Sequence, residues 1–350
     1  MKKDFISGTE FPLSELKRIV SAGIAYKQAV SEGRYEALPD LSHKIVTLLF
    51  ANPSLRTRLS FESGLKKMRA GVNIMNTGDS WQFEYQDGVV MDGGKQEHIK
   101  EAARVISQYT DVIGLRNSEL MTTSASQNST SSYESLREDQ PIRQLAKYAT
   151  KPVINMESNM YHPCQALADM MTMVEQFGME GVQKKKYVLT WAPHPKALPL
   201  ATPHSQFLTP AMFGMNVVVA HPEGFDLDPE VVTLAKAEAE KSGGSIAFTH
   251  DQAEAFSGAE VIVAKSWASM QYFGKWEEEK AHRAKFTDWT VDAAKMRLTR
   301  NAYFMHCLPV RRNVVVTDEV LDSERSLIIQ EAENRMWAQM ALVAYVLDAL

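Results

Sequence analysis

Residues 44–58 read KIVTLLFANPSLRTR. Residues 44–51 are mostly apolar and include β-branched side chains, which predicts a buried strand, and a helical pattern over residues 57–70 follows a short Asn-Pro-Ser turn. A strand that leads into a helix in this way is the unit from which parallel sheets covered by helices are built. The stretch therefore predicts an α/β fold, with a turn at the carboxyl end of a parallel strand.

The same alternation of strands and helices runs through the first half of the chain and starts afresh in the second half. Further helices are expected at residues 12–30, 96–109, 141–149, 166–177 and 231–241. Further strands are expected at residues 72–76, 111–116, 152–156, 187–191, 217–220, 246–249, 261–264 and 302–305. We expect two doubly wound parallel-sheet domains, residues 1–158 and 159–328, with a long helix over residues 329–350 that packs back on the first domain.

Composition limits the kind of partner that this chain binds. Its 350 residues are 45% hydrophobic and 23% charged, and the net charge of -5 comes from interspersed acids and bases, so neither nucleic acid nor an anionic membrane is indicated. No apolar run reaches the roughly 20 residues of a membrane-spanning helix, and the first residues lack the apolar core of a signal peptide. We expect a cytoplasmic protein with small-molecule partners.

The turn after the first strand has the residues of a phosphate site. Backbone N–H groups at a helix N-terminus are unpaired and carry partial positive charge. Ser54 and Thr57 add hydroxyl groups, and Arg56 can form two parallel hydrogen bonds to an anion. A plain serine cap on a solvated helix is the alternative.

Two further motifs follow predicted strands. His162-Pro163-Cys164-Gln165 supplies an imidazole and an amide, which can polarise a carbonyl oxygen or hold an amino group, although a histidine in this place is also a common cap. His306-Cys307-Leu308-Pro309 leaves backbone carbonyls able to accept from amines. Cys307 as a nucleophile, and a metal held by the cysteines and histidines, are weaker alternatives because neither a thiolate-activating pair nor a metal-ligand spacing is present.

Three single residues are weaker candidates. Arg116 ends an apolar strand and suits an oxyanion, Lys265 follows another apolar strand, and Trp81 lies in an irregular stretch. Each is equally compatible with an ordinary surface or core position. The stretch of residues 117–133 is rich in Ser, Thr and Asn and predicts a surface loop of the kind that often closes over ligands.

Together the motifs S-x-R-T-R, H-P-x-Q and H-C-L-P resemble, in order and spacing, those of the aspartate/ornithine carbamoyltransferase family, over nearly the whole chain. Within that family the chain looks most like the N-acetylornithine and N-succinylornithine transcarbamylases. The elements that carry this closer likeness are Met91-Asp92-Gly93, Trp191-Ala192-Pro193-His194-Pro195, Lys265-Ser266-Trp267 and Glu331-Ala332-Glu333-Asn334-Arg335.

The resemblance implies a fold of two doubly wound domains with the active site between them, a homotrimer, no cofactor and no metal. It implies transfer of the carbamoyl group of carbamoyl phosphate to the side-chain amine of an N-acylornithine, in arginine biosynthesis. The residues implied for carbamoyl phosphate are Ser54, Leu55, Arg56, Thr57, Trp81 from a neighbouring subunit, Arg116, His162, Gln165, Cys307, Leu308 and Arg335. Those implied for the acylornithine are Gln96, Glu157, Lys265, Cys307, Leu308 and Arg311. Catalysis itself is assigned to Arg56, Arg116, His162, Gln165 and Cys307.

Two positions bear on the acyl group. The acetyl-specific enzymes carry a glutamate where this chain has Gln96, and a lysine where it has Val315. Gln96 lacks the negative charge that would repel a succinyl carboxylate, and Lys265 and Arg311 can pair with one. N-succinylornithine is therefore the favoured acceptor, with N-acetylornithine as the alternative. A catalytically silent carbamoyl phosphate-binding module is an alternative of a different class.

Overall fold

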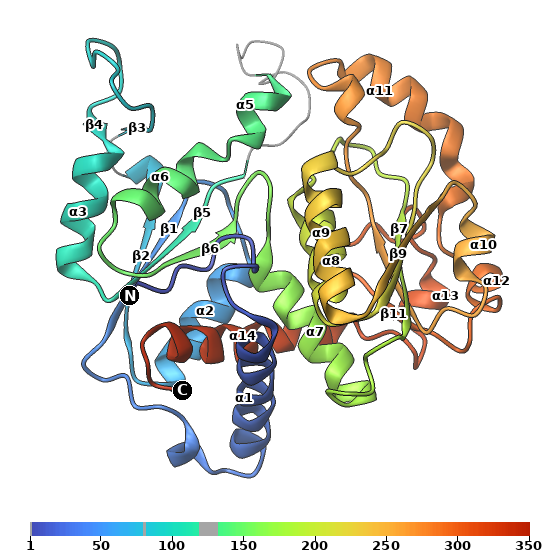
Figure 1. Ribbon diagram of the computed structural model, residues 1–350, viewed down its shortest axis with the longest axis horizontal. Coiled ribbons are helices and arrows are strands. Elements are labelled where there is room, and N and C mark those ends of the chain that lie inside the picture. Colours follow the sequence, from blue (N-terminus) through green and yellow to red (C-terminus); the bar gives the residue numbers. More distant parts are fainter. Residues whose placement is uncertain (1, 80–81, 119–131) are drawn as a thin grey trace. The chain divides into compact units, whose positions relative to one another are not determined.

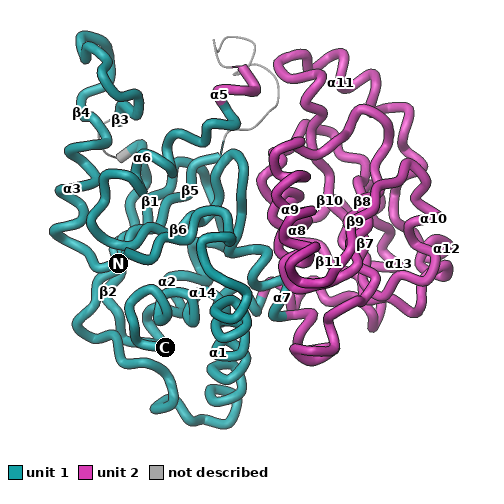
Figure 2. Tube along the Cα trace, in the orientation of Figure 1, with its two compact units in different colours: residues 1–119, 136–171, 333–350 teal, residues 120–135, 172–332 magenta. Residues whose placement is uncertain are grey.

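The computed structural model describes residues 2–79, 82–118 and 132–350 (Figure 1). The chain divides into two compact units, shown in two colours in Figure 2. The first unit comprises residues 1–119, 136–171 and 333–350, and the second comprises residues 120–135 and 172–332. Residues 159–171 thus belong to the first unit, and so does the C-terminal part of the last helix.

The first unit is built on a four-stranded parallel sheet in the order β2-β1-β5-β6. Its strands are β1 (Ile45–Phe50), β2 (Gly71–Asn76), β5 (Val112–Arg116) and β6 (Val153–Glu157). The inner strands are apolar and buried along nearly their whole length, as is typical of parallel strands covered by helices. A short two-stranded ribbon, β3 (Phe83–Glu84) and β4 (Glu97–His98), precedes α3.

Helices of this unit pack on the sheet and on one another. They are α1 (Leu13–Ser31), α2 (Arg56–Lys67), α3 (Ile99–Tyr109), α6 (Gln140–Tyr148), the greater part of α7 (Pro163–Phe177) and the greater part of α14 (Ile328–Val346), with the 3-10 turns η1 (Tyr35–Ala37) and η2 (Thr77–Asp79). Apolar side chains of α3 and α6 share a core with β1 and β5. Helices α2 and α14 approach closely at Gly64, where an added Cβ would lie 2.7 Å from the Met340 side chain. The glycine thus allows α14 to pack closely against the C-terminal half of α2.

The second unit is built on a five-stranded parallel sheet in the order β11-β10-β7-β8-β9. Its strands are β7 (Lys186–Trp191), β8 (Asn216–Ala220), β9 (Ser245–Thr249), β10 (Val261–Lys265) and β11 (Tyr303–Met305). Its helices are α8 (Ala201–Met212), α9 (Pro229–Ser242), α10 (Gln252–Phe256), α11 (Trp276–Arg283), α12 (Ala293–Met296) and α13 (Asp318–Leu321), with η3 (Met270–Tyr272), η4 (Ala284–Trp289) and the first residues of α5 (Tyr133–Arg137).

Each sheet has one position where the order of its strands reverses. In the first sheet the chain runs outward from β1 to β2 and then returns to place β5 on the other side of β1. In the second sheet the chain runs from β7 through β8 to β9 and then places β10 on the other side of β7. Open α/β sheets bind ligands outside the carboxyl ends of the strands at such positions. Each unit should therefore bind a ligand at the carboxyl ends of the two strands on either side of the reversal. We call these places the β1/β5 edge, in the first unit, and the β7/β10 edge, in the second unit.

The predicted fold class is confirmed, and the predicted strands lie within one or two residues of the observed ones. Four of the predicted helices differ from expectation by three or four residues at one end: α2 ends at Lys67 rather than at residue 70, α14 ends at Val346 rather than at residue 350, and α7 and α3 begin elsewhere. Helix α7 begins at Pro163 rather than at residue 166, because a proline fits the first turn of a helix, where its missing N–H is not needed. Helix α3 begins at Ile99, because residues 97–98 pair with β3 instead.

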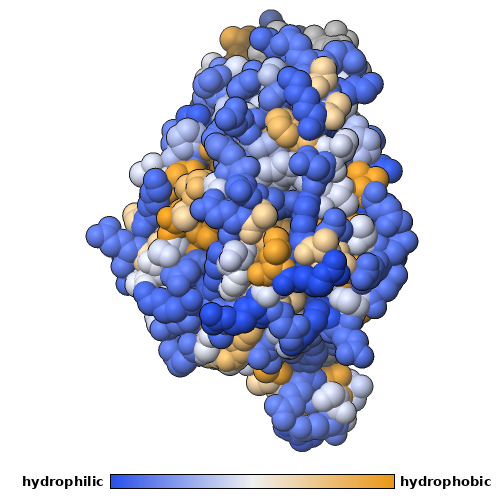
Figure 3. All heavy atoms as spheres, turned by 90° about the vertical axis from the view of Figure 1, so that its right-hand side faces the viewer, coloured by the Kyte–Doolittle hydropathy of each residue, from blue (hydrophilic) through white to orange (hydrophobic). Residues whose placement is uncertain are grey.

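Charged and polar side chains prevail on the face shown in Figure 3, and apolar side chains gather there only in small groups. Over the described part of the chain, none of the helices combines the length and apolar character needed to cross a membrane.

Candidate active site

The first candidate site lies where β1 ends and α2 begins. Ser54 Oγ accepts a hydrogen bond of 3.3 Å from the backbone N–H of Thr57, in the first turn of α2. Asn52 Oδ1 accepts one of 2.8 Å from the N–H of Ser118, which follows β5. The turn is thus tied to both strands at the reversal, and the start of α2 presents N–H groups at that edge. The side chain of Leu55 is 68% exposed, so this residue has only its backbone to offer a ligand there.

Two arginines meet at the hydroxyl group of Thr57. Arg116, the last residue of β5, donates from Nη1 to Thr57 Oγ1 at 3.2 Å. Arg335, on α14, donates from Nη2 to the same oxygen at 2.7 Å. Thr57 is fully buried, and its hydroxyl oxygen has the two lone pairs needed to accept both. The side chain therefore gathers two guanidinium groups at the N-terminus of α2.

The electrostatics of this cluster favour an anion. Arg335 is 3% exposed, and burial, followed by repulsion from Arg116 and Arg56, lowers its pKa to about 10. Glu157 forms an ion pair with Arg116, and its negative charge partly offsets the lowering of the Arg335 pKa. Among the described residues, the buried Nε–H groups of Arg116 and Arg335 have no hydrogen-bond partner. A bound anion would supply the missing acceptors.

Glu157 is the last residue of the neighbouring strand β6, and His162 and Gln165 follow that strand. Glu157 forms an ion pair with Arg116, and His162 Nε2 lies 3.6 Å from Glu157 Oε2. Gln165 donates from Nε2 to Asp169 Oδ1 at 2.7 Å, one turn further along α7, which fixes its amide. All three residues are buried. The structure thus links the predicted Arg116 and His162 through one carboxylate.

A residue that the sequence analysis missed, Asp139, supports the turn before His162. Its carboxylate is 1% exposed and accepts from Ser158 Oγ at 2.5 Å and from the N–H of Asn159 at 3.0 Å. Asn155 adds a hydrogen bond of 2.9 Å from Nδ2 to Ser158 Oγ. Asp139 belongs to none of the three motifs, so no sequence signal pointed to it. Burial raises the pKa of Asp139 to about 6, partly offset by these hydrogen bonds.

We expect this carboxyl to make folding stability depend on pH. Between about pH 4 and pH 6 the folded protein retains a proton on Asp139 that the unfolded chain has released, so the free energy of unfolding should fall as pH rises through that range. The decrease should be about 3 kcal/mol, at 1.36 kcal/mol for each pH unit, with no further change above pH 7. Urea unfolding of the wild type and of Asp139→Asn is measured from pH 4 to pH 8. The difference between their free energies of unfolding at each pH isolates the contribution of Asp139. A difference that stays flat across that range would show that Asp139 has an ordinary pKa.

The second candidate site lies at the β7/β10 edge. Lys265 ends β10 in register with Trp191 of β7, and its carbonyl accepts from the N–H of Ala192 at 3.1 Å. His194 follows two residues later. Its pKa is lowered to about 4 by burial and by the positive charges of Lys265, Arg311 and Arg283, so it is neutral at pH 7. These cations therefore lie close enough to His194 to disfavour a further positive charge, which suits the binding of a carboxylate. Sequence analysis had placed His194 in a motif without giving it a role.

The turn from His306 to Leu308 is held by hydrogen bonds of its own. The N–H of His306 donates to Glu331 Oε2 at 2.9 Å, and the N–H of Leu308 donates to His306 Nδ1 at 2.9 Å. Leu308 has φ +53°, a conformation that branched side chains rarely adopt. Within the described residues no backbone N–H donates to the carbonyls of Cys307 or Leu308, which leaves them able to accept from an amine.

The remaining predictions concern thiols and metals. Burial raises the pKa of the Cys164 thiol to about 12, which makes it a poor nucleophile at neutral pH. The described ranges contain no group of three or more His, Cys, Asp or Glu side chains placed to hold a metal ion.

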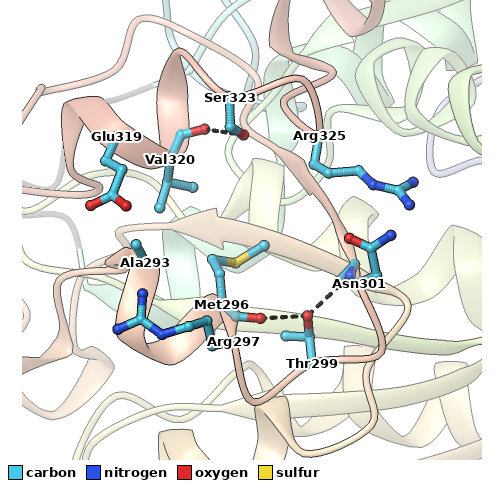
Figure 4. A pocket seen from close by; sticks show the side chains of 10 residues that line it. Ala293, Met296, Arg297, Thr299, Asn301, Glu319, Val320, Ser323 and Arg325 are labelled. Carbon is cyan, nitrogen blue, oxygen red and sulfur yellow. Dashed lines mark hydrogen bonds between the residues drawn. The ribbon is translucent and has the colours of Figure 1, made fainter.

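Some predicted residues are not joined to these clusters. Trp81 and most of the 117–133 loop lie outside the described residues. Gln96 is exposed beside the β3/β4 ribbon, where its Oε1 accepts from the N–H of Gln82 at 3.3 Å. A hollow of about 530 Å³ in the second unit, between α12 and α13, contains none of the predicted site residues (Figure 4).

Two models of protein families match this chain, each over a different part of it. The model of the carbamoyl-P binding domain of aspartate/ornithine carbamoyltransferases matches residues 3–175, and the model of their Asp/Orn binding domain matches residues 201–346. The chain belongs to the aspartate/ornithine carbamoyltransferase family. It is a carbamoyltransferase, and the resemblance seen in its motifs is confirmed.

Individual relatives cover nearly the whole of this carbamoyltransferase. N-acetylornithine carbamoyltransferase of Xanthomonas axonopodis pv. citri is 39% identical over 344 residues, 98% of this chain and 96% of the relative. N-succinylornithine carbamoyltransferase of Bacteroides thetaiotaomicron is 35% identical over 338 residues, 95% of this chain and 96% of the relative. A crystal structure of a glutamate-to-alanine variant of N-acetyl-L-ornithine transcarbamylase, complexed with carbamyl phosphate and N-succinyl-L-norvaline, matches with a TM-score of 0.90 at 38% identity, covering 98% of this chain and 99% of that one.

Proposed function

We propose that the first unit binds carbamoyl phosphate at the β1/β5 edge. The observation that carries the proposal is the convergence of Arg116 and Arg335 on Thr57 at the N-terminus of α2. Ser54, the N–H groups of Leu55 to Thr57, and Arg56 would hold the phosphate. Arg116, His162 and Gln165 would hold the carbamoyl group.

This arrangement suits the chemistry of carbamoyl transfer. Attack of an amine on the carbamoyl carbon builds negative charge on the carbamoyl oxygen and then releases phosphate. Positively charged donors that are already in place stabilise both charges without reorganising during the reaction. Each hydrogen bond to a charged group contributes about 1.5–3 kcal/mol, so several of them account for a large rate enhancement. The attacking amine must be neutral, so turnover should be faster toward alkaline pH.

We propose that the second unit supplies the residues for an N-acylornithine. Lys265 and Arg311 would pair with its carboxylate, and the carbonyls of Cys307 and Leu308 would accept from its side-chain amine. The positive charge around His194 supports an acylated acceptor over free ornithine, because acylation removes the charge of the α-amino group. Glu157, at the end of β6 in the first unit, and Gln96 complete the proposed acceptor contacts. The reaction belongs to arginine biosynthesis.

For the acyl group we propose succinyl. Gln96 carries no charge that would repel a succinyl carboxylate, and Val315 stands where the acetyl-specific pattern has a lysine. Val315 is 2% exposed, so it has the environment of a core side chain. N-acetylornithine is the second candidate, and it is favoured by the higher identity, 39% against 35%, to relatives named for the acetyl substrate.

The deciding experiment gives purified protein carbamoyl phosphate with N-succinylornithine, N-acetylornithine or ornithine, each in a separate assay. We expect phosphate release and formation of N-succinylcitrulline, with a larger kcat/KM for the succinyl than for the acetyl substrate. A larger kcat/KM for N-acetylornithine would establish the second candidate. No phosphate release with any of the three would contradict the proposal and leave a silent binding module.

The proposal includes a homotrimer in which Trp81 of one subunit closes the phosphate site of the next. It is supported by apolar side chains that the first unit exposes, including Leu55 at the N-cap of α2, Leu59 on α2 and Tyr109 at the end of α3.

A further inference from the structure

Arg283, the last residue of α11, is a buried cation that none of the motifs contains. Its side chain is 5% exposed and lies beside the β7/β10 edge of the second unit. Nη1 donates to Ser266 Oγ at 2.9 Å, and Nη2 donates to the carbonyl of Trp267 at 3.0 Å. Nη2 also forms an ion pair with Glu279, one turn earlier on α11. One guanidinium group thus holds two successive residues directly after β10.

Aromatic rings enclose the same guanidinium group. Arg283 Cζ lies 5.3 Å from the ring centre of Trp191, which ends β7, and 5.2 Å from that of Phe225, in the segment after β8. Hydrogen bonds also join Trp191 and Phe225 to the segment after β10. Trp191 Nε1 donates to the carbonyl of Trp267 at 3.1 Å, and Trp267 Nε1 donates to the carbonyl of Phe225 at 2.8 Å. Arg283 therefore fixes the carboxyl ends of three strands relative to one another.

The segments that Arg283 holds carry the second candidate site. Lys265 directly precedes Ser266, and His194 lies three residues after Trp191. The charge of Arg283 also reaches the imidazole of His194, where it acts together with Lys265 and Arg311. The residues that Arg283 contacts thus lie directly next to Lys265, which is proposed to bind the acceptor, and three residues from His194.

A role in folding alone does not account for this arrangement. Replacing a buried ion pair by apolar side chains of similar volume is often neutral or stabilising, so the Arg283–Glu279 pair is weak evidence for stability. The distinctive property of Arg283 is its planar guanidinium fork, whose two Nη groups donate hydrogen bonds in fixed directions while its faces lie against aromatic rings. Such a group specifies geometry more than it adds stability.

We propose that Arg283 is a positioning residue for the acceptor half of the reaction, holding residues 265–267 and the end of β7 so that Lys265 and His194 keep the places needed to bind the acylornithine. This inference rests on the proposed function. It assigns Arg283 an effect on acceptor binding, and none on carbamoyl phosphate, which is bound by the first unit.

The test is Arg283→Lys, which keeps the charge but loses the fork. We expect the KM for the acylornithine to rise at least tenfold, and the affinity for an inert N-acyl-L-norvaline, measured by calorimetry, to fall to the same extent. The KM for carbamoyl phosphate should stay within twofold of wild type. Arg297→Lys, an exposed arginine at the hollow of Figure 4, is the matched control and should change neither KM.

A second variant keeps the test decisive if Arg283→Lys does not fold. Ser266→Ala removes one acceptor of the fork without touching the ion pair, and it should raise the acylornithine KM about threefold with the same selectivity. Unchanged KM values in the variant that folds, or equal increases in both KM values, would overturn the inference and leave a purely structural arginine. Wild-type protein without any acylornithine turnover would instead reject the proposed function, and the inference with it.

Discussion

Arg56→Ala is expected to lower kcat/KM for carbamoyl phosphate by about 100- to 1000-fold, the loss typical of removing one donor from a transition-state anion site. Arg56 lies at the start of α2 and is close enough to Arg335 to lower the pKa of that buried guanidinium. Its removal takes a donor from the proposed phosphate site and also relieves a repulsion between like charges. We therefore expect the unliganded variant to remain folded, so that its loss of turnover can be assigned to the site.

Thermal unfolding separates these two effects of the Arg56 substitution. Carbamoyl phosphate should raise the unfolding temperature (Tm) of the wild type, because it binds the folded state preferentially. It should raise the Tm of the variant much less. Arg104→Ala, an exposed arginine on α3 in the same unit, is the control and should keep both turnover and ligand stabilisation. Wild-type turnover in Arg56→Ala would mean that the start of α2 is not the phosphate site.

Gln96→Glu is expected to change the acyl preference. The substitution keeps the size and shape of the side chain and adds only a negative charge, so it isolates the electrostatic contribution. We expect kcat/KM for N-succinylornithine to fall about 10- to 100-fold, because the added carboxylate repels the succinyl carboxylate. Such a decrease corresponds to about 1.4–2.8 kcal/mol of lost binding free energy. N-acetylornithine has no carboxylate on its acyl group, and its kcat/KM should stay within about threefold.

The ratio of the two kcat/KM values is the measurement, because a general loss of active enzyme cancels in it. Gln108→Glu, which adds the same charge at an exposed position on α3, should leave the ratio unchanged. If Gln96→Glu also leaves it unchanged, the acyl group does not reach Gln96, and the preference must come from other residues such as Lys265 or Arg311.

Local sequence predicted most of the fold because parallel strands and their helices have strong local patterns. The apolar run at residues 44–51 became β1, and the turn after it became the start of α2. Helix α8 is the instructive exception. All twelve of its residues are buried and Pro210 lies inside it, so it shows neither an apolar stripe on one face nor a good helix-forming composition. A helix covered on all sides cannot be recognised from amphipathic periodicity.

The sequence by itself determined the family, the two sheets and the motifs at their strand ends, because these depend on neighbouring residues. Only the tertiary structure decided which charges meet. Thr57 and Arg335 are 278 residues apart, yet they share a hydrogen bond of 2.7 Å, which brings Arg335 to the charges of Arg116 and Arg56 that lower its pKa. Asp139 and Arg283 belong to no motif, because a residue that positions others is defined by what it touches in space. Short-range patterns specify strands and turns, whereas burial and long-range contacts determine which side chains share one electrostatic environment.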